Sequence, residues 1–215
     1  MSELEIVTLP NGQFVQNCYL LADARTREAV MVDPGEEPGV FLAELDTRGW
    51  TLGGIWLTHA HVDHIMGVGA VKRARDVPIY LHPADRALYD ALPQQGGWMG
   101  VELEPLPPPD VELHGGGRVR VGRHDFEVRH TPGHSPGSVS FVGHGMIIGG
   151  DVLFNGSVGR TDLPGGDAAA LMQSIQQHFL SLPDSTVVHS GHGPDTTIGV
   201  ERLTNPFLTG AYRVE

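Results

Sequence analysis

Residues 58–64, Thr-His-Ala-His-Val-Asp-His, place three imidazoles and one carboxylate in a short segment. The segment directly follows the apolar run 54–57, which is typical of a buried strand that ends in a loop at the edge of a sheet. His59 and His61 alternate, so in an extended segment their side chains point to the same side. Asp63 and His64 follow where we expect the chain to turn into a helix. We therefore expect this one loop to contribute ligands to two adjacent metal ions.

Three later segments share this character, because each follows a predicted strand and carries one metal-binding residue among glycines. They are residues 131–137 with His134, residues 149–151 with Asp151, and residues 190–194 with His192. Glycine lets the backbone come close to a ligand or a metal. The whole set comprises five histidines and two aspartates. Seven ligands are too many for one tetrahedral ion, but they suit two ions that share a bridging carboxylate.

The elements that must position these residues alternate between strand-rich and helical stretches. The hydrophobic pattern predicts strands at residues 6–9, 17–21, 29–32, 55–57, 77–81, 111–113, 119–121, 126–130, 138–142, 146–148 and 186–188. It predicts helices at residues 38–48, 83–90 and 198–203, a short one after the histidine loop, and one that Asp167 caps, with the stripe Leu171, Ile175 and Phe179. This order, without a linker, implies two sheets packed face to face with helices outside.

The segment 92–110 differs from its surroundings, because it is rich in Pro and Gly and carries Trp98 and Met99. Its composition predicts a surface loop in which these two side chains pack against the loop itself. Alternatively, Trp98 and Met99 cover the metal site. We expect none of the histidines outside the motifs to bind metal, since isolated histidines have many uses: His82, His114, His124, His130, His144, His178 and His189.

The overall composition excludes several classes of protein. The formal net charge of −12 argues against a surface that binds nucleic acid or an anionic membrane. The single cysteine, Cys18, excludes an intramolecular disulfide and a Cys-rich zinc site, and we expect it to be a small buried hydrophobe. We expect no signal peptide, because the first residues lack a basic region followed by an apolar core. No apolar run approaches the roughly 20 residues of a membrane span, so a cytoplasmic location is expected.

The motif of residues 59–64, with His134, Asp151 and His192 in their Gly-rich contexts, resembles the metallo-β-lactamase superfamily. The resemblance spans nearly the whole chain, from residues 16–19 through 32–35 to 205–208, and it is strongest to the small glyoxalase II-like hydrolases, which share the loop 159–162, Gly-Arg-Thr-Asp. It implies an α/β fold, a four-layer αββα sandwich with the metal site at the sheet edge. We expect one such domain over residues 1–215.

The resemblance also assigns the ligands by position. It implies that the first ion is bound by His59, His61 and His134, that the second is bound by Asp63, His64 and His192, and that Asp151 bridges them. Asp63 is expected in addition to orient the attacking hydroxide. Zinc is the first expectation for both divalent ions, with iron or manganese as alternatives, because imidazole and carboxylate ligands accept all three.

Three departures from better-known members narrow the expected activity. Metallo-β-lactamases with a zinc-binding Cys have it where Asp151 stands here, so antibiotic hydrolysis is not expected. Few residues follow His192, so we expect no separate C-terminal domain of the kind that binds glutathione in full-length glyoxalase II enzymes. Arg160 stands near the metals, where it either holds a substrate carboxylate bidentately or braces the loop through Asp162.

The resemblance therefore implies a dinuclear metal-dependent hydrolase in which a hydroxide between the ions attacks an acyl carbon. The expected partner is a small-molecule thioester, a hydroxyacyl-glutathione such as lactoylglutathione; the oligomeric state stays open. The main alternative is a mononuclear iron persulfide dioxygenase, which uses only the positions of His59, His134 and Asp151. An ester or lactone hydrolase, an RNA-processing nuclease and a non-enzymatic metal-binding module are weaker alternatives.

Overall fold

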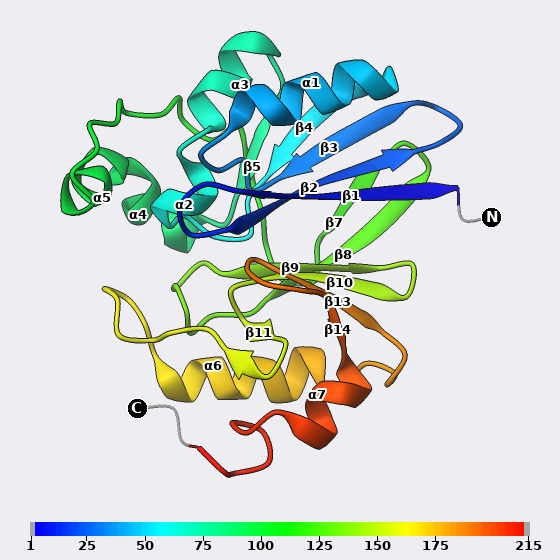
Figure 1. Ribbon diagram of the computed structural model, residues 1–215, viewed down its shortest axis with the longest axis vertical. Coiled ribbons are helices and arrows are strands. Elements are labelled where there is room, and N and C mark those ends of the chain that lie inside the picture. Colours follow the sequence, from blue (N-terminus) through cyan, green and yellow to red (C-terminus); the bar gives the residue numbers. More distant parts are fainter. Residues whose placement is uncertain (1–2, 213–215) are drawn as a thin grey trace.

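The structure is a computed structural model and describes residues 3–212. Two six-stranded sheets lie face to face, and helices cover the outer face of each sheet (Figure 1). The layers follow the order αββα, so the predicted sandwich is confirmed. Among the described residues, no helix combines the length and apolar character that crossing a membrane requires.

The first sheet has the strand order β1-β2-β3-β4-β5-β6. Its strands are β1 Leu4–Asn11, β2 Gln16–Asp23, β3 Glu28–Val32, β4 Thr51–Trp56, β5 Ile79–Leu81 and β6 Val111–Glu112. The first three strands are antiparallel neighbours, whereas β3 to β6 run parallel. Parallel strands end at the same edge of a sheet, so the segments that follow β3, β4 and β5 meet there.

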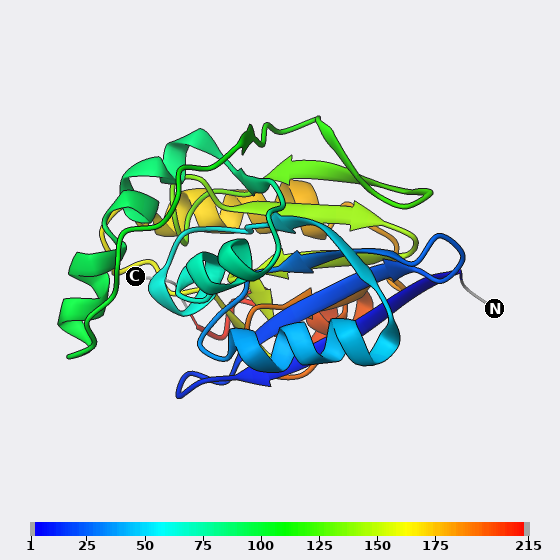
Figure 2. The same ribbon diagram turned by 90° about the horizontal axis from the view of Figure 1, so that it is seen from above.

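Helices flank this sheet on its outer face and at its edge. They are α1 (Pro38–Arg48), α2 (Val62–Ile65), α3 (Val68–Ala74), the 3-10 helix η1 (Pro83–Asp85), α4 (Arg86–Asp90) and α5 (Leu92–Trp98). As predicted, α1 ends at Arg48, and the following Gly49 adopts the left-handed conformation (φ 64°) that favours glycine. α1 and α3 cover the sheet, whereas α4 and α5 lie at the margin of the molecule, beyond the ends of the strands (Figure 1, Figure 2).

The second sheet has the strand order β14-β13-β10-β9-β8-β7. Its strands are β7 Arg118–Val121, β8 His124–His130, β9 Val139–Gly143, β10 Met146–Gly150, β13 Val187–Ser190 and β14 Thr196–Thr197; a small separate sheet pairs β11 Leu153–Phe154 with β12 Ser157–Val158. The outer face of the second six-stranded sheet is covered by α6 (Ala168–Ser174), the π-helical segment η2 (Ile175–Phe179) and α7 (Ile198–Thr204). Asp167 caps α6 as predicted, because its carboxylate accepts a hydrogen bond from Ala170 N.

Three separate hydrophobic cores hold the four layers together. β2 shows how one strand serves two of them, since alternate side chains point to opposite faces of a sheet. Leu20 packs in the core under α1, together with Phe41, whereas Tyr19 and Leu21 pack in the core between the two sheets, together with Trp56. A third core lies under α6 and η2, and it contains the predicted stripe Leu171, Ile175 and Phe179.

The prediction of a surface loop over the whole of residues 92–110 is wrong in its first part, which forms α5. Pro93 is tolerated in the first turn of a helix, where its missing N–H is not needed. Leu92 and Gln95 are buried, so contacts with the rest of the protein outweigh the low helix propensity of Gly96 and Gly97. The following residues, 101–109, contain no helix or strand, in agreement with the prediction.

Candidate metal centre

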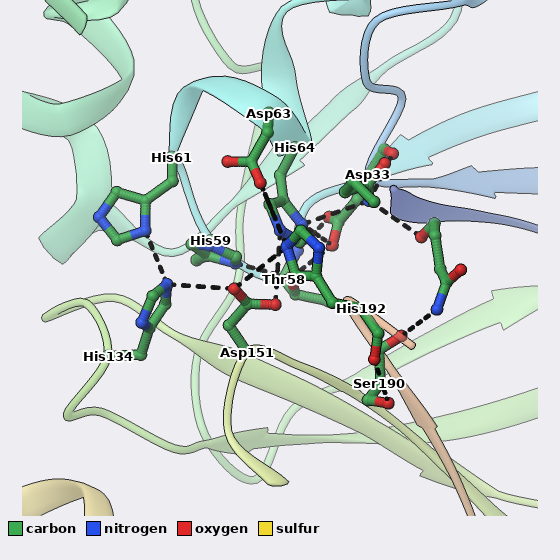
Figure 3. A network of polar contacts seen from close by, with 12 residues as sticks. Asp33, Thr58, His59, His61, Asp63, His64, His134, Asp151, Ser190 and His192 are labelled. Atoms are coloured by element: carbon green, nitrogen blue, oxygen red, sulfur yellow. Dashed lines mark hydrogen bonds and ion pairs between the residues drawn. The ribbon is translucent and has the colours of Figure 1, made fainter. Parts of the chain in front are cut away.

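All seven predicted ligands lie together at one edge of the two sheets, although they come from four loops that are far apart in the chain (Figure 3). The ligand atoms of one group all lie within 4.8 Å of one another, and the same holds for a second group. The first group is His59, His61 and His134; the second is Asp63, His64 and His192. None of the seven histidines that we expected to have other roles belongs to a group of this kind among residues 3–212.

The Asp151 carboxylate lies between the two groups (Figure 3). Its Oδ2 is 3.5 Å from Nε2 of His134 in the first group and 3.5 Å from Nε2 of His192 in the second. Its Oδ1 is 3.4 Å from Nε2 of His64. From this position the carboxylate could be shared by two ions, as the resemblance implies. Gly191 leaves room for the Asp151 carboxylate, because a Cβ atom at residue 191 would collide with it.

Several buried polar atoms of these residues have no hydrogen-bond partner, although such atoms are almost always paired in proteins. They are Nε2 of His59, His61 and His64, and Oδ1 of Asp151. In addition, His61 Nδ1 and His134 Nε2 approach each other to 2.8 Å, so two imidazole nitrogens point at one place. Imidazole and carboxylate donors that converge in this way fit divalent zinc, iron or manganese.

Four of the histidines are held by a partner on the other ring nitrogen, Nδ1. The partners are the Asp33 carboxylate for His64 (2.9 Å), the Arg160 carbonyl for His134 (2.8 Å), the Phe14 carbonyl for His192 (3.0 Å) and the Thr58 hydroxyl for His59 (3.0 Å). Such partners fix the orientation of a ligand ring and leave Nε2 free for a metal.

Asp33 is a functional residue that the sequence analysis missed, since residues 32–35 were named only as part of the family resemblance and no role was assigned to Asp33. Its Oδ1 accepts a hydrogen bond from Thr58 N (2.7 Å), and its Oδ2 accepts one from Thr58 Oγ (2.5 Å) in addition to pairing with His64. Because these contacts occupy both oxygens, we assign Asp33 the role of orienting the ligand loop. An acidic residue directly after a parallel strand at the same edge was the available signal.

Asp85 is a second missed residue, and it joins two of the ligand loops. Its carboxylate is fully buried and accepts hydrogen bonds from Ala60 N (3.0 Å), Ser135 Oγ (2.7 Å) and Gly137 N (2.5 Å). Ala60 lies between His59 and His61, and Ser135 follows His134. One carboxylate therefore connects the loops that supply all three histidines of the first group.

Gln95 of α5 is a third missed residue, and it fixes α5 against the histidine loop. Its amide oxygen accepts a hydrogen bond from Val62 N (3.0 Å), and its nitrogen donates to the carbonyls of Ala60 (3.0 Å) and Leu88 (2.8 Å). The sequence offered no signal for it, because these contacts depend on how α5 docks.

His59, His61 and Asp151 are held in the forms that bind metal, which are neutral imidazole and ionised carboxylate, whereas His64 is held in the charged form. Burial, and then the neighbouring imidazoles, hold the pKa of His59 well below its usual range and lower that of His61 to about 3. Burial also opposes charge on His64, but the carboxylates of Asp151 and Asp63 raise its pKa well above the usual range. Burial opposes ionisation of Asp151, yet His64 lowers the pKa of that carboxyl.

The cluster opens into a pocket of about 380 Å³. Beside five of the candidate ligands, the pocket is lined by Phe14, Val62, Leu88, Gln95, Trp98, Met99, Arg160, Leu163 and Pro164. Trp98 is 72% exposed, so the expectation that it packs within its own loop is wrong, and it stands with Met99 on the pocket wall. Arg160 pairs bidentately with Asp162 at 2.6 and 2.7 Å. Of the two roles considered for Arg160, this contact matches bracing of the loop and not binding of a substrate carboxylate.

Comparison with known proteins agrees with this geometry. The family model of the metallo-β-lactamase superfamily matches residues 11–192. The probable metallo-hydrolase YqgX of Bacillus subtilis is 40% identical over 206 residues, which is 94% of this chain and 96% of that protein. The hydroxyacylglutathione hydrolase GloC of Haemophilus influenzae is 35% identical over 209 residues, which is 95% of this chain and 98% of that protein.

Solved structures show the same relationship. BLEG-1, described as a B3 metallo-β-lactamase, is 42% identical with a TM-score of 0.90, over 96% of this chain and all of that one. TTHA1623, solved in a di-iron-bound form, is 43% identical with a TM-score of 0.87, over 94% of this chain and 100% of that one. ETHE1 of Myxococcus xanthus is 28% identical with a TM-score of 0.83, over 96% of this chain and 85% of that one. Because the family model covers most of the chain and the relatives align with it almost from end to end, the chain belongs to the metallo-β-lactamase superfamily.

Proposed function

We propose that this protein is a dinuclear metal-dependent thioesterase that hydrolyses hydroxyacyl-glutathione thioesters such as lactoylglutathione. The observation that carries the proposal is the position of Asp151, within 3.5 Å of histidines from both ligand groups. The similarity to GloC, a hydroxyacylglutathione hydrolase, supports the substrate class. Two divalent ions in such a site supply Lewis acidity, which activates water at neutral pH and polarises the carbonyl under attack.

The side chains of the protein have defined roles in this proposal. The ionised Asp63 lines the pocket, and its Oδ2 lies 3.2 Å from His192 Nε2, so it is placed to orient the attacking water. A cysteine nucleophile is not required. Cys18 is fully buried, and burial raises the pKa of its thiol well above the usual range, which disfavours the reactive thiolate.

Two other activities have specific support and belong in the same test. The similarity to ETHE1 fits a mononuclear iron dioxygenase that acts on persulfides. The similarity to BLEG-1 makes β-lactam hydrolysis a candidate. The expectation against antibiotic hydrolysis depended on the absence of a Cys at position 151, and an aspartate there does not by itself exclude that activity.

The test combines metal analysis of the purified protein with three assays: lactoylglutathione hydrolysis, oxygen consumption with a persulfide, and hydrolysis of a β-lactam. We expect two metal ions per chain, thioester hydrolysis without oxygen, and loss of that activity in His59→Ala with an unchanged circular dichroism spectrum. His82→Ala is the matched control, because His82 is a partly buried histidine outside the cluster. One iron per chain with oxygen uptake, or hydrolysis of the β-lactam alone, would reject the proposal.

A further inference from the structure

Beside the candidate ligands, the wall of the pocket is largely apolar. It is built from five separate segments, and the side chains that form it are Phe14, Val62, Leu88, Trp98, Met99, Leu163 and Pro164. Phe14 and Trp98 are 49% and 72% exposed, so both line the pocket while much of their apolar surface remains accessible to solvent. Apolar pockets with few polar groups are typical of sites that bury an apolar part of a ligand.

Apart from the candidate ligands, the polar side chains that line the pocket are Gln95 and Arg160, and both are already engaged. Both ends of the Gln95 amide bind backbone groups. Among the described residues that line the pocket, Arg160 is the single Lys or Arg, and its guanidinium is paired bidentately with Asp162. A glutathione moiety carries two carboxylates and an ammonium group, and the wall offers no free partner for them. The acyl group of the substrate is therefore the part that suits this wall.

We propose that the pocket selects hydroxyacyl thioesters whose acyl group carries an apolar substituent larger than a methyl group, with the thiol portion directed to solvent. This inference depends on the thioesterase function proposed above. Each methylene that becomes buried against the wall is expected to raise kcat/KM about fourfold, the ratio that corresponds to about 0.8 kcal/mol. Trp98, the most exposed large side chain of the wall, is expected to provide much of this contact.

The experiment uses the metal-loaded full chain and a series of glutathione thioesters with 2-hydroxypropanoyl (lactoyl), 2-hydroxybutanoyl and 2-hydroxyhexanoyl groups. Since the thiol stays the same, only the acyl chain varies. Released thiol is measured with a chromogenic reagent, and the single cysteine of the chain, Cys18, is buried and should not interfere. We expect kcat/KM to rise along the series, and we expect Trp98→Ala to reduce the rise to less than twofold per methylene.

Leu203→Ala is the matched control, because Leu203 is a 77% exposed apolar side chain on α7 that does not line the pocket. It should leave the dependence on chain length unchanged. Equal kcat/KM values along the series, or the same rise in Trp98→Ala as in the unmodified protein, would overturn the inference while the thioesterase function stands. If protein with two bound metals hydrolyses none of these thioesters, both the inference and the proposed thioesterase function are refuted.

Discussion

Replacement of Asp85 by Asn tests whether one buried carboxylate holds the first ligand group in place. The carboxylate has two oxygens and accepts three hydrogen bonds, from Ala60 N, Ser135 Oγ and Gly137 N. Asparagine has one acceptor oxygen, so it keeps at most two of these bonds and presents an NH₂ group to a remaining donor. We therefore expect the loops that carry His59, His61 and His134 to separate slightly.

The magnitude follows from the bonds that are lost. A hydrogen bond to a charged group contributes about 1.5–3 kcal/mol. Loss of a residue that orients metal ligands typically lowers metal affinity about 10- to 100-fold, which corresponds to about 1.4–2.8 kcal/mol. One lost bond therefore accounts for the whole expected effect. We expect Asp85→Asn to lower the affinity of one metal site about 10- to 100-fold and to change the second site less.

The assay is a calorimetric titration of chelator-treated protein with Zn²⁺, accompanied by thermal unfolding without metal. The matched control is Asp23→Asn. Asp23 is equally buried and accepts hydrogen bonds from Arg123, but it lies at the end of β2 away from the ligand loops. The control should lose stability and keep both metal affinities. Unchanged zinc binding in Asp85→Asn, or an equal loss of affinity in the two variants, would refute the reasoning.

Three further predictions concern single side chains. His192→Ala removes a ligand of the second group only, so metal analysis should give one ion per chain instead of two; two retained ions would contradict the assignment. The hydrogen bonds from Arg123 lower the pKa of the Asp23 carboxyl, so they stabilise the fold above about pH 4, the usual pKa range of Asp, and this contribution is lost as the pH falls further. Urea unfolding of Asp23→Asn should accordingly differ from the unmodified protein at pH 7, and this difference should begin to narrow only as the pH falls below about 4. Burial, and then His130, lower the pKa of His82 to about 4, so NMR titration should give a midpoint near that value, and His130→Ala should raise it; a midpoint near 6.5 would contradict this packing.

The candidate ligands could be predicted from the sequence because each carries its signal locally. His134, Asp151 and His192 each follow a predicted strand and stand beside glycine, and parallel strands end at a common edge. The layers were predicted from the order of strand-rich and helical stretches. The structure agrees, since β2 is buried along its whole length, as a strand between two layers must be.

The orienting residues could not be predicted, because their role arises from contacts between distant segments. Asp85 is separated from Ser135 by 50 residues, and nothing near it in the sequence indicates that its carboxylate accepts three hydrogen bonds. α5 was missed because Gly96 and Gly97 argue against a helix, and the contacts of Gln95 that stabilise it are equally non-local. Local propensity carries no information about such pairings.

The hydrogen bonds between β2 and the last ligand loop have a consequence for the order in which the protein assembles during synthesis. Asn17 donates to the carbonyls of Ser190 and Gly193, and the Tyr19 hydroxyl donates to Ser190 O. These partners are 171–176 residues apart, so they cannot meet until nearly the whole chain has left the ribosome. The three histidines of the first group, His59, His61 and His134, leave the ribosome earlier. A nascent chain should therefore be able to capture one cation before the pocket for the other exists.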